Sequence, residues 1–383
     1  MDNEHRAAIT WSRITEAGDQ VARALVNTLG YASAVEYVRE WDPRSANLVQ
    51  TNENDGRSAT MIQRYQQRLF ALPEFDETVL GKLGITVLIP DDNAWPAAFD
   101  DLGEDAPLAV WIRGDVSNLA QPMLAMVGSR DASPYGERLA RDLAYELSSD
   151  LRIVSGGAFG IDAQAHRGGL LADSTSVIVS AGGVDRPYPR AHTGLFTDTL
   201  AAGGAIVSEA PLAAAPQRHR FLSRNRLIAA LGGATVVVEA PFRSGALSTA
   251  RHAFAIGRPV GAIPGAVNQA SSAGCNELIR NGATLVRHTQ DIRELVSWQQ
   301  LTMEDLAGED FFNPASDADY DAVKERVWEA LPIARFAGVA SIAQTAGLTL
   351  NETQIRLGKL LVDGRAEQRD GRWRRVRGTN GNT

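Results

Sequence analysis

The segment RHRFLSRNR, residues 218–226, places five basic or potentially basic side chains within nine positions, together with one phenylalanine and one asparagine. Guanidinium groups hold phosphates through paired hydrogen bonds, and an aromatic ring between them can stack on a base. The alternative is a solvated charged face, but no acid interrupts the chain from Pro211 to Arg226. The segment therefore predicts contact with the backbone of a single-stranded nucleic acid.

Two glycine-rich phrases could hold phosphates as well. In VGSR, residues 127–130, the glycine lets a backbone N–H approach an anion, although such a short phrase alone equally fits a structural strand end. In SGGAFGID, residues 155–162, three glycines and a serine precede a helix-like stretch, whose first amides would face an anion. Asp162 fits a first-turn or capping role. The order is not G-x-G-x-x-G and no P-loop lysine follows, which favours a phosphate backbone over nicotinamide or ATP.

Weaker signals come from two further turns. In GGVDRPYP, residues 182–189, Tyr188 could stack on a base, while a purely structural turn explains the phrase equally well. Ser244 and Gly245 open another helix-like stretch with small donors. Both turns are expected at the same edge as the arginines.

The elements that must position these residues are apolar runs alternating with helix-like stretches. Continuous apolar strands of this kind predict a parallel sheet covered by helices on both faces, a doubly wound α/β fold. Ligands of such sheets bind beyond the carboxyl ends of the strands. The six runs, with their glycine or small-residue turns, are 124–130, 151–162, 175–189, 205–211, 234–240 and 259–265.

Four segments are predicted along the chain. Residues 1–75 form a helical, SAM-like region, and residues 76–298 form the α/β domain with its N-terminal extension. Residues 299–322 are an acidic linker. In residues 323–383, two helices at 341–346 and 351–363 precede a basic hairpin turning at Asp370-Gly371, which predicts a winged-helix domain.

The bulk composition limits the function classes. The formal charge of −8 over 383 residues argues against coating nucleic acid by overall charge, but it allows a local basic groove. A single cysteine precludes an internal disulfide and favours a reducing cytoplasm. We expect no signal peptide and no membrane span. The histidines show no metal spacing and the acids no catalytic pairing, so we expect no metal, no cofactor and no enzymatic activity.

In chain order, the phrases VGSR, SGGAFGID, GGVDRPYP, SEAP, FLSRNRLIA, SGALSTA, GRPVGAIPG and SAGCNELIRNGA resemble the motifs of the DNA-processing protein A family, also called DprA or Smf. The resemblance covers about 107–295 and implies a Rossmann-like, dimeric protein that is not known as an enzyme. Members bind single-stranded DNA, protect incoming DNA during natural transformation and load the RecA recombinase. Arg130 and the stretch 224–226 would contact the DNA backbone above the turn at 155–160. His192 departs from the asparagine that members often carry there.

Motifs and resemblance together give the predicted DNA-binding residues: Gly128, Ser129, Arg130, Ser155, Gly156, Gly157, Gly160, Tyr188, Arg218, Arg220, Phe221, Arg224, Asn225, Arg226, Ser244 and Gly245. Two alternatives stay open. The glycine turns could hold one mononucleotide in a nucleotide-binding or nucleotide-hydrolysing enzyme, with Glu239 as its best candidate for a catalytic carboxylate. Alternatively, the basic hairpin at 365–377 could make the principal contact, with duplex DNA.

Overall fold

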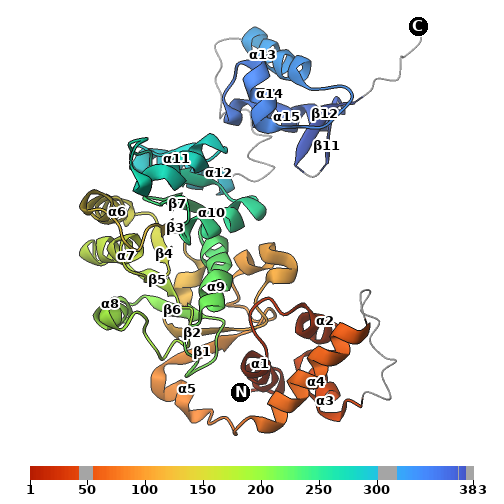
Figure 1. The fold of residues 1–383 in the computed structure, drawn as a ribbon, viewed down its shortest axis with the longest axis vertical. Helices are drawn as coiled ribbons and strands as arrows, with labels where there is room; N and C mark the ends of the chain where they lie inside the picture. Colours follow the sequence, from red (N-terminus) through yellow and green to blue (C-terminus); the bar gives the residue numbers. More distant parts are fainter. Residues whose placement is uncertain (43–54, 301–316, 370, 377–383) are drawn as a thin grey trace. The chain divides into compact units, whose positions relative to one another are not determined.

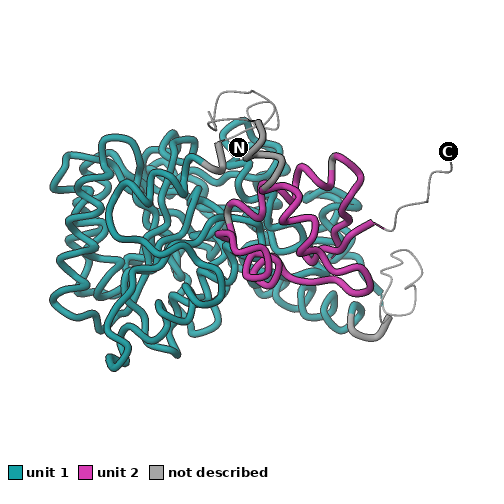
Figure 2. The backbone as a smooth tube through the Cα atoms, turned by 90° about the horizontal axis from the view of Figure 1, so that it is seen from above, with its two compact units in different colours: residues 1–300 teal, residues 301–383 magenta. Residues whose placement is uncertain are grey.

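The computed structural model describes residues 1–42, 55–300, 317–369 and 371–376. Its chain divides into two compact units, residues 1–300 and residues 301–383; Figure 2 colours them separately. The predicted DNA-binding residues all belong to the larger unit. Each unit is therefore described by itself.

A mostly parallel sheet forms the centre of the larger unit (Figure 1). Its strand order is β1-β2-β6-β5-β4-β3-β7-β8-β9, in which β3 to β9 run parallel and β1 and β2 pair antiparallel at one edge. The strands are β1 Ile85–Leu88, β2 Val110–Gly114, β3 Met123–Val127, β4 Arg152–Ser155, β5 Ser176–Val179, β6 Ala205–Ser208, β7 Ala234–Val237, β8 Val260–Ala262 and β9 Thr284–Leu285. All six predicted strands are present, which confirms the predicted parallel sheet.

The direction of the chain across the sheet changes between β3 and β7. From β3 it moves through β4 and β5 to β6, then crosses back to β7 on the other side of β3. Crossovers leaving β3 and β7 diverge, so their carboxyl ends border an opening in which such sheets bind ligands. VGSR ends β3, and it therefore lies at this position.

Helices cover both faces of the sheet, as the apolar strands predict. On β3, Ala125 and Val127 pack in one core with helices α9 and α10, whereas Leu124 and Met126 pack in another core with α6 and α7. Figure 1 shows these two groups of helices on either side of the strands. The helices are α6 Pro134–Leu147, α7 Ile161–Leu171, α8 Thr193–Ala201, α9 Arg218–Leu231, α10 Ala246–Ala255, α11 Ala273–Arg280 and α12 Thr289–Gln300.

The N-terminal helices share a core with the sheet. Trp11 and Tyr65 meet edge to face at 5.7 Å and belong to one apolar cluster with Trp111 of β2 and Phe196 of α8. This packing fixes the helical region against the β2 and β6 side of the sheet. The loop expected at 51–58 lies partly outside the described residues, and its positions 55–58 belong to α4. The helices are α1 Asn3–Ile14, α2 Gln20–Leu29, α3 Tyr31–Glu40, α4 Asp55–Ala71 and α5 Thr78–Leu83.

The smaller unit has its own core, which includes Val327, Leu357 and Trp373. A capping box between Thr349 and Glu352 begins α15. Its elements are α13 Asp317–Ala330, β10 Ala337–Gly338, α14 Val339–Ala346, α15 Leu350–Val362, β11 Ala366–Arg369 and β12 Arg372–Arg375, with the sheet order β10-β12-β11. The winged-helix assignment stays a prediction. Most of the predicted acidic linker, residues 301–316, lies outside the described residues, and 317–322 belong to α13.

Candidate nucleic-acid interface

A groove of about 450 Å³ opens at the carboxyl ends of β3 and β7. Its size falls in the range of ligand sites, roughly 300–1,000 Å³. The turn after β3, the first half of α9 and the start of α10 form its walls. Its charged lining residues are four arginines and two aspartates: Arg130, Arg218, Arg224, Arg243, Asp131 and Asp162. The groove is thus locally basic in an acidic chain, which suits an anionic ligand.

Close packing explains the glycines of the β3 turn. The Ser129 N–H donates to the Glu239 carbonyl oxygen at 2.6 Å, and the Ser129 carbonyl accepts from Ile161 N–H at 3.2 Å. A Cβ on Gly160, whose φ is +72°, would lie 2.2 Å from the Ser129 carbonyl oxygen. A Cβ on Gly128 would lie 2.4 Å from Ile161. These glycines let α7 begin directly against the strand end, and this contact sets the position of Arg130.

Arg130 is exposed at the groove and takes part in a stack with two aromatic rings. Its guanidinium carbon lies 5.0 Å from the centroid of the Phe221 ring, on α9. The Phe221 ring lies 5.6 Å from the ring of Tyr188, which follows β5 and is 46% exposed. We call Arg130, Phe221 and Tyr188 the stacking edge. It combines a phosphate-binding cation with surfaces on which bases can stack.

The turn after β4 lies beneath the groove. The buried Ser155 hydroxyl donates to the Met126 carbonyl at 2.6 Å, so it is committed to the sheet. The Gly156 N–H donates to the Asp162 carboxylate at 3.1 Å, and the Gly157 carbonyl lies 3.0 Å from His192 Nδ1. His192, where the family often has asparagine, thus holds the backbone of this turn. Ser155, Gly156 and Gly157 support the groove, as the resemblance implies.

Arg224 is buried and ties two strand ends together. It donates to the carbonyl of Gly156 at 3.1 Å and to the carbonyl of Val179, which ends β5. Burial lowers the pKa of Arg224 to about 10, while Asp162 opposes the shift and Arg130 adds to it. Burial raises the pKa of Asp162, against the charge of Arg224. The Arg224 guanidinium therefore supplies positive charge to the groove floor from a fixed position.

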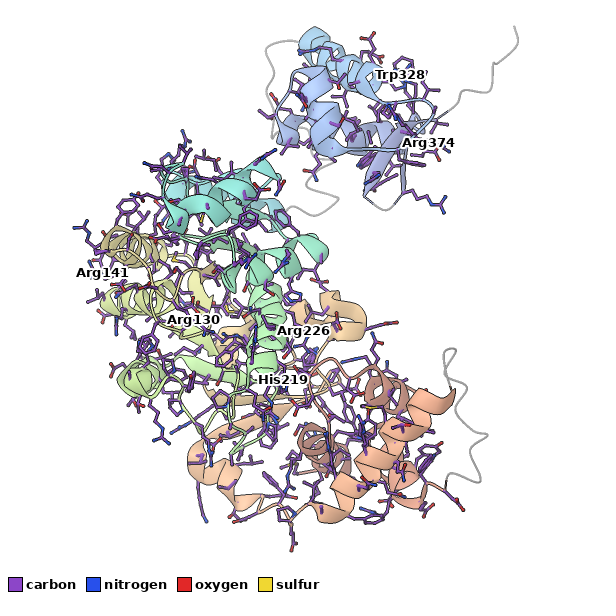
Figure 3. The ribbon with its side chains drawn as sticks, viewed as in Figure 1. Arg130, Arg141, His219, Arg226, Trp328 and Arg374 are labelled. Atoms are coloured by element: carbon purple, nitrogen blue, oxygen red, sulfur yellow. The ribbon has the colours of Figure 1, made fainter. Side chains whose placement is uncertain are left out.

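Successive residues of α9 face opposite ways because each residue turns about 100° around a helix axis. Arg218, Phe221 and Asn225 line the groove, and the Asn225 side-chain amide donates to the Gly245 carbonyl at 3.2 Å. Arg226 is 3% exposed and faces away (labelled in Figure 3). Its guanidinium donates to the Asp105 carbonyl at 2.6 Å and to the Glu209 carboxylate at 2.9 Å.

The structure therefore does not bring Arg226 to the groove, and its contacts are those of a structural residue. Arg220 also faces away from the groove, toward the N-terminal region, where it pairs with Glu16. At the start of α10, the Ser244 hydroxyl accepts from the Ala246 N–H at 3.2 Å. A Cβ on Gly245 would have no atom within 4 Å. Ser244 and Gly245 line the groove opposite Arg130.

Arg243 is a groove residue that the sequence did not single out. It is exposed, lines the groove beside Ser244, and makes no ion pair with any described residue. An isolated arginine carries little signal by itself. Its place directly before a serine-glycine helix start, shortly after a strand end, is the signal by which it could have been found.

Glu239 caps a helix. Its carboxylate accepts from the Ser133 hydroxyl at 2.7 Å and from the Ser133 N–H at 3.2 Å, at the first turn of α6. Both contacts match the structural role expected for this residue ahead of catalysis. Among the described residues, no cluster of histidine, cysteine or acidic side chains could hold a metal ion. No helix in the described part of the chain is long and apolar enough to cross a membrane.

Comparisons of sequence identify relatives of the chain. Residues 86–297 match the family described as DNA recombination-mediator protein A. A DprA homologue of Mycobacterium tuberculosis is 42% identical over 98% of this chain and 96% of its own length. The DNA processing protein DprA of Streptococcus pneumoniae is 38% identical over 50% of this chain and 68% of its own length.

Two solved structures resemble this one. The X-ray structure of DNA processing protein A from Streptococcus pneumoniae matches with a TM-score of 0.61 and 28% identity, over 77% of this chain and 98% of that one. The Helicobacter pylori protein matches with a TM-score of 0.50 and 31% identity, over 56% of this chain and 96% of that one. The latter structure is described as showing a unique single-stranded DNA binding mode.

Proposed function

Because the chain belongs to the DNA recombination-mediator protein A family, we propose that it binds single-stranded DNA in the groove between the β3 turn, α9 and α10. The observation that carries the proposal is the stacking edge beside a groove with four arginines. The Helicobacter pylori relative, which binds single-stranded DNA, supports it.

The groove favours a single strand over a duplex. Arg130, Arg218 and Arg243 would hold phosphates through charge-assisted hydrogen bonds. Phe221 and Tyr188 would stack on bases, and only unpaired bases can turn out to reach aromatic rings. The bound strand would run from Arg243 across the groove to Tyr188.

The same proposal covers the wider role of the protein. We propose that it acts as a recombination mediator in the cytoplasm, protecting incoming single strands and transferring them to the RecA recombinase during natural transformation. We propose that it works as a homodimer and is not an enzyme. These points rest on the family, and no residues are assigned to the dimer or RecA contacts.

Fluorescence anisotropy of labelled single-stranded and double-stranded oligonucleotides, at two salt concentrations, tests the binding proposal. We expect preference for the single strand and weaker binding at higher salt, because phosphate contacts release counterions. Failure to bind single strands at low salt would refute it.

Two variants separate the alternatives. Nucleotide turnover that disappears in Glu239→Gln would instead favour the nucleotide-hydrolysing enzyme. Deletion of residues 301–383, a separate compact unit, addresses the smaller unit with its basic hairpin. Unchanged single-strand binding would place the principal contact in the larger unit.

A further inference from the structure

Glu16 joins the N-terminal helical region to the first turn of α9. Its carboxylate accepts from Arg220 Nε at 2.9 Å and from a terminal nitrogen of Arg220 at 2.7 Å, and it lies 3.2 Å from His219 Nε2. Burial alone would raise the pKa of Glu16, but the hydrogen bonds from Arg220 and His219 hold it below its usual value. Two basic side chains of the arginine-rich segment are therefore occupied by an acid from the same chain.

The pair lies next to the path predicted for DNA. Arg218 lines the groove, and Arg220, two residues further along the same helical turn, faces Glu16. A strand that leaves the groove over the start of α9 passes directly to Arg220 and His219 (labelled in Figure 3). A carboxylate bound in two places by a guanidinium occupies the geometry that a phosphate would take.

We propose that Glu16 competes with a DNA phosphate for Arg220 and His219, so that it limits how far a bound single strand extends past α9. This inference rests on single-strand binding in the groove. Displacing Glu16 leaves the fold intact, because its side chain is 41% exposed and returns to water. Arg220 keeps its bond to the Ala215 carbonyl at 3.0 Å during the exchange.

The size of the effect follows from the exposure of the pair. Exposed ion pairs contribute only about 0.2–1 kcal/mol, so Glu16 weakens binding without preventing it. Removing its charge should tighten binding of a long single strand about two- to fivefold. The salt dependence should steepen by about 0.7 for each phosphate gained, since each new contact releases counterions from the strand.

The test measures the affinity of a labelled oligothymidine, long enough to pass the start of α9, over a salt series. The variants are Glu16→Gln, Arg220→Ala and their combination. Glu77→Gln is the matched control because Glu77 also pairs with an arginine, Arg6, within the same unit but away from α9. The gain in affinity should appear only in Glu16→Gln and disappear when Arg220→Ala is added.

Three results would overturn the inference while single-strand binding stands. These are no gain in Glu16→Gln, an equal gain in Glu77→Gln, or a gain that persists with Arg220→Ala. An equal gain in the control would mean that net charge alone acts on the strand. Absence of binding by every protein in the series would overturn both this inference and the proposed function.

Discussion

The guanidinium of Arg130 lies over the ring of Phe221, with 5.0 Å between the guanidinium carbon and the ring centroid. Arg130 follows β3, whereas Phe221 belongs to α9, so the contact joins the two walls of the groove. A cation over an aromatic face is stabilised by about 0.5–1 kcal/mol at exposed sites. The contact thereby fixes a phosphate-binding group and a base-stacking surface side by side.

Phe221→Ala removes the ring at the centre of the stacking edge. Because stacking contributes about 1–3 kcal/mol per base, single-strand affinity should fall between about fivefold and 150-fold. The slope of affinity against salt should stay unchanged, since no phosphate contact is lost. Anisotropy over a salt series checks both. Phe70→Ala, at a 67% exposed ring on α4, is the control; an equal loss there would argue against stacking on Phe221.

Gly160→Ala should destabilise the larger unit. Its φ of +72° is unfavourable for alanine, and the added Cβ would lie 2.2 Å from the Ser129 carbonyl oxygen. We expect a loss of at least about 2 kcal/mol in the free energy of unfolding, measured by urea denaturation. Gly245→Ala is the comparison, because its Cβ meets no atom within 4 Å. Similar stability of the two variants would contradict the packing role of Gly160.

Arg226→Ala should affect stability rather than affinity. It leaves the Glu209 carboxylate without its cation and breaks the link to the Asp105 carbonyl, which we expect to cost about 3 kcal/mol. Thermal denaturation measures that loss, and anisotropy on the folded fraction measures binding. A specific loss of single-strand affinity with normal stability would return Arg226 to the DNA-binding residues.

His166 should make stability depend on pH. Burial lowers the pKa of its imidazole to about 3, whereas the unfolded chain titrates near 6.5. The unfolded state therefore binds a proton below pH 6.5 that the folded state excludes. Stability that is full above pH 6.5 should fall as the pH decreases, by about 2 kcal/mol at pH 5 from this residue. Unfolding curves of His166→Gln should lack that part of the pH dependence. Parallel pH dependences for the two proteins would contradict the assignment.

The strand ends were predictable from the sequence because each apolar run stops at a glycine or small residue, as at Gly128 and Gly156. The opposite orientations of Arg224 and Arg226 were not, since a run of letters does not show which face of α9 each residue takes. The shared core of Trp11 and Trp111 was also hidden, because nothing local signals contact between distant segments. Arg243 was missed because its neighbours in space come from other strands.

Arg130→Ala tests the central claim most directly. Arg130 is exposed at the groove and bonds to no part of the core, so its loss should leave the fold unchanged. We predict about tenfold weaker binding of single-stranded DNA, with a salt slope reduced by about 0.7, as expected for one lost phosphate contact. Arg280→Ala, whose side chain is 82% exposed on α11, should bind like wild type. Equal affinity and equal salt slope for Arg130→Ala and wild type would contradict the assignment of this groove to DNA.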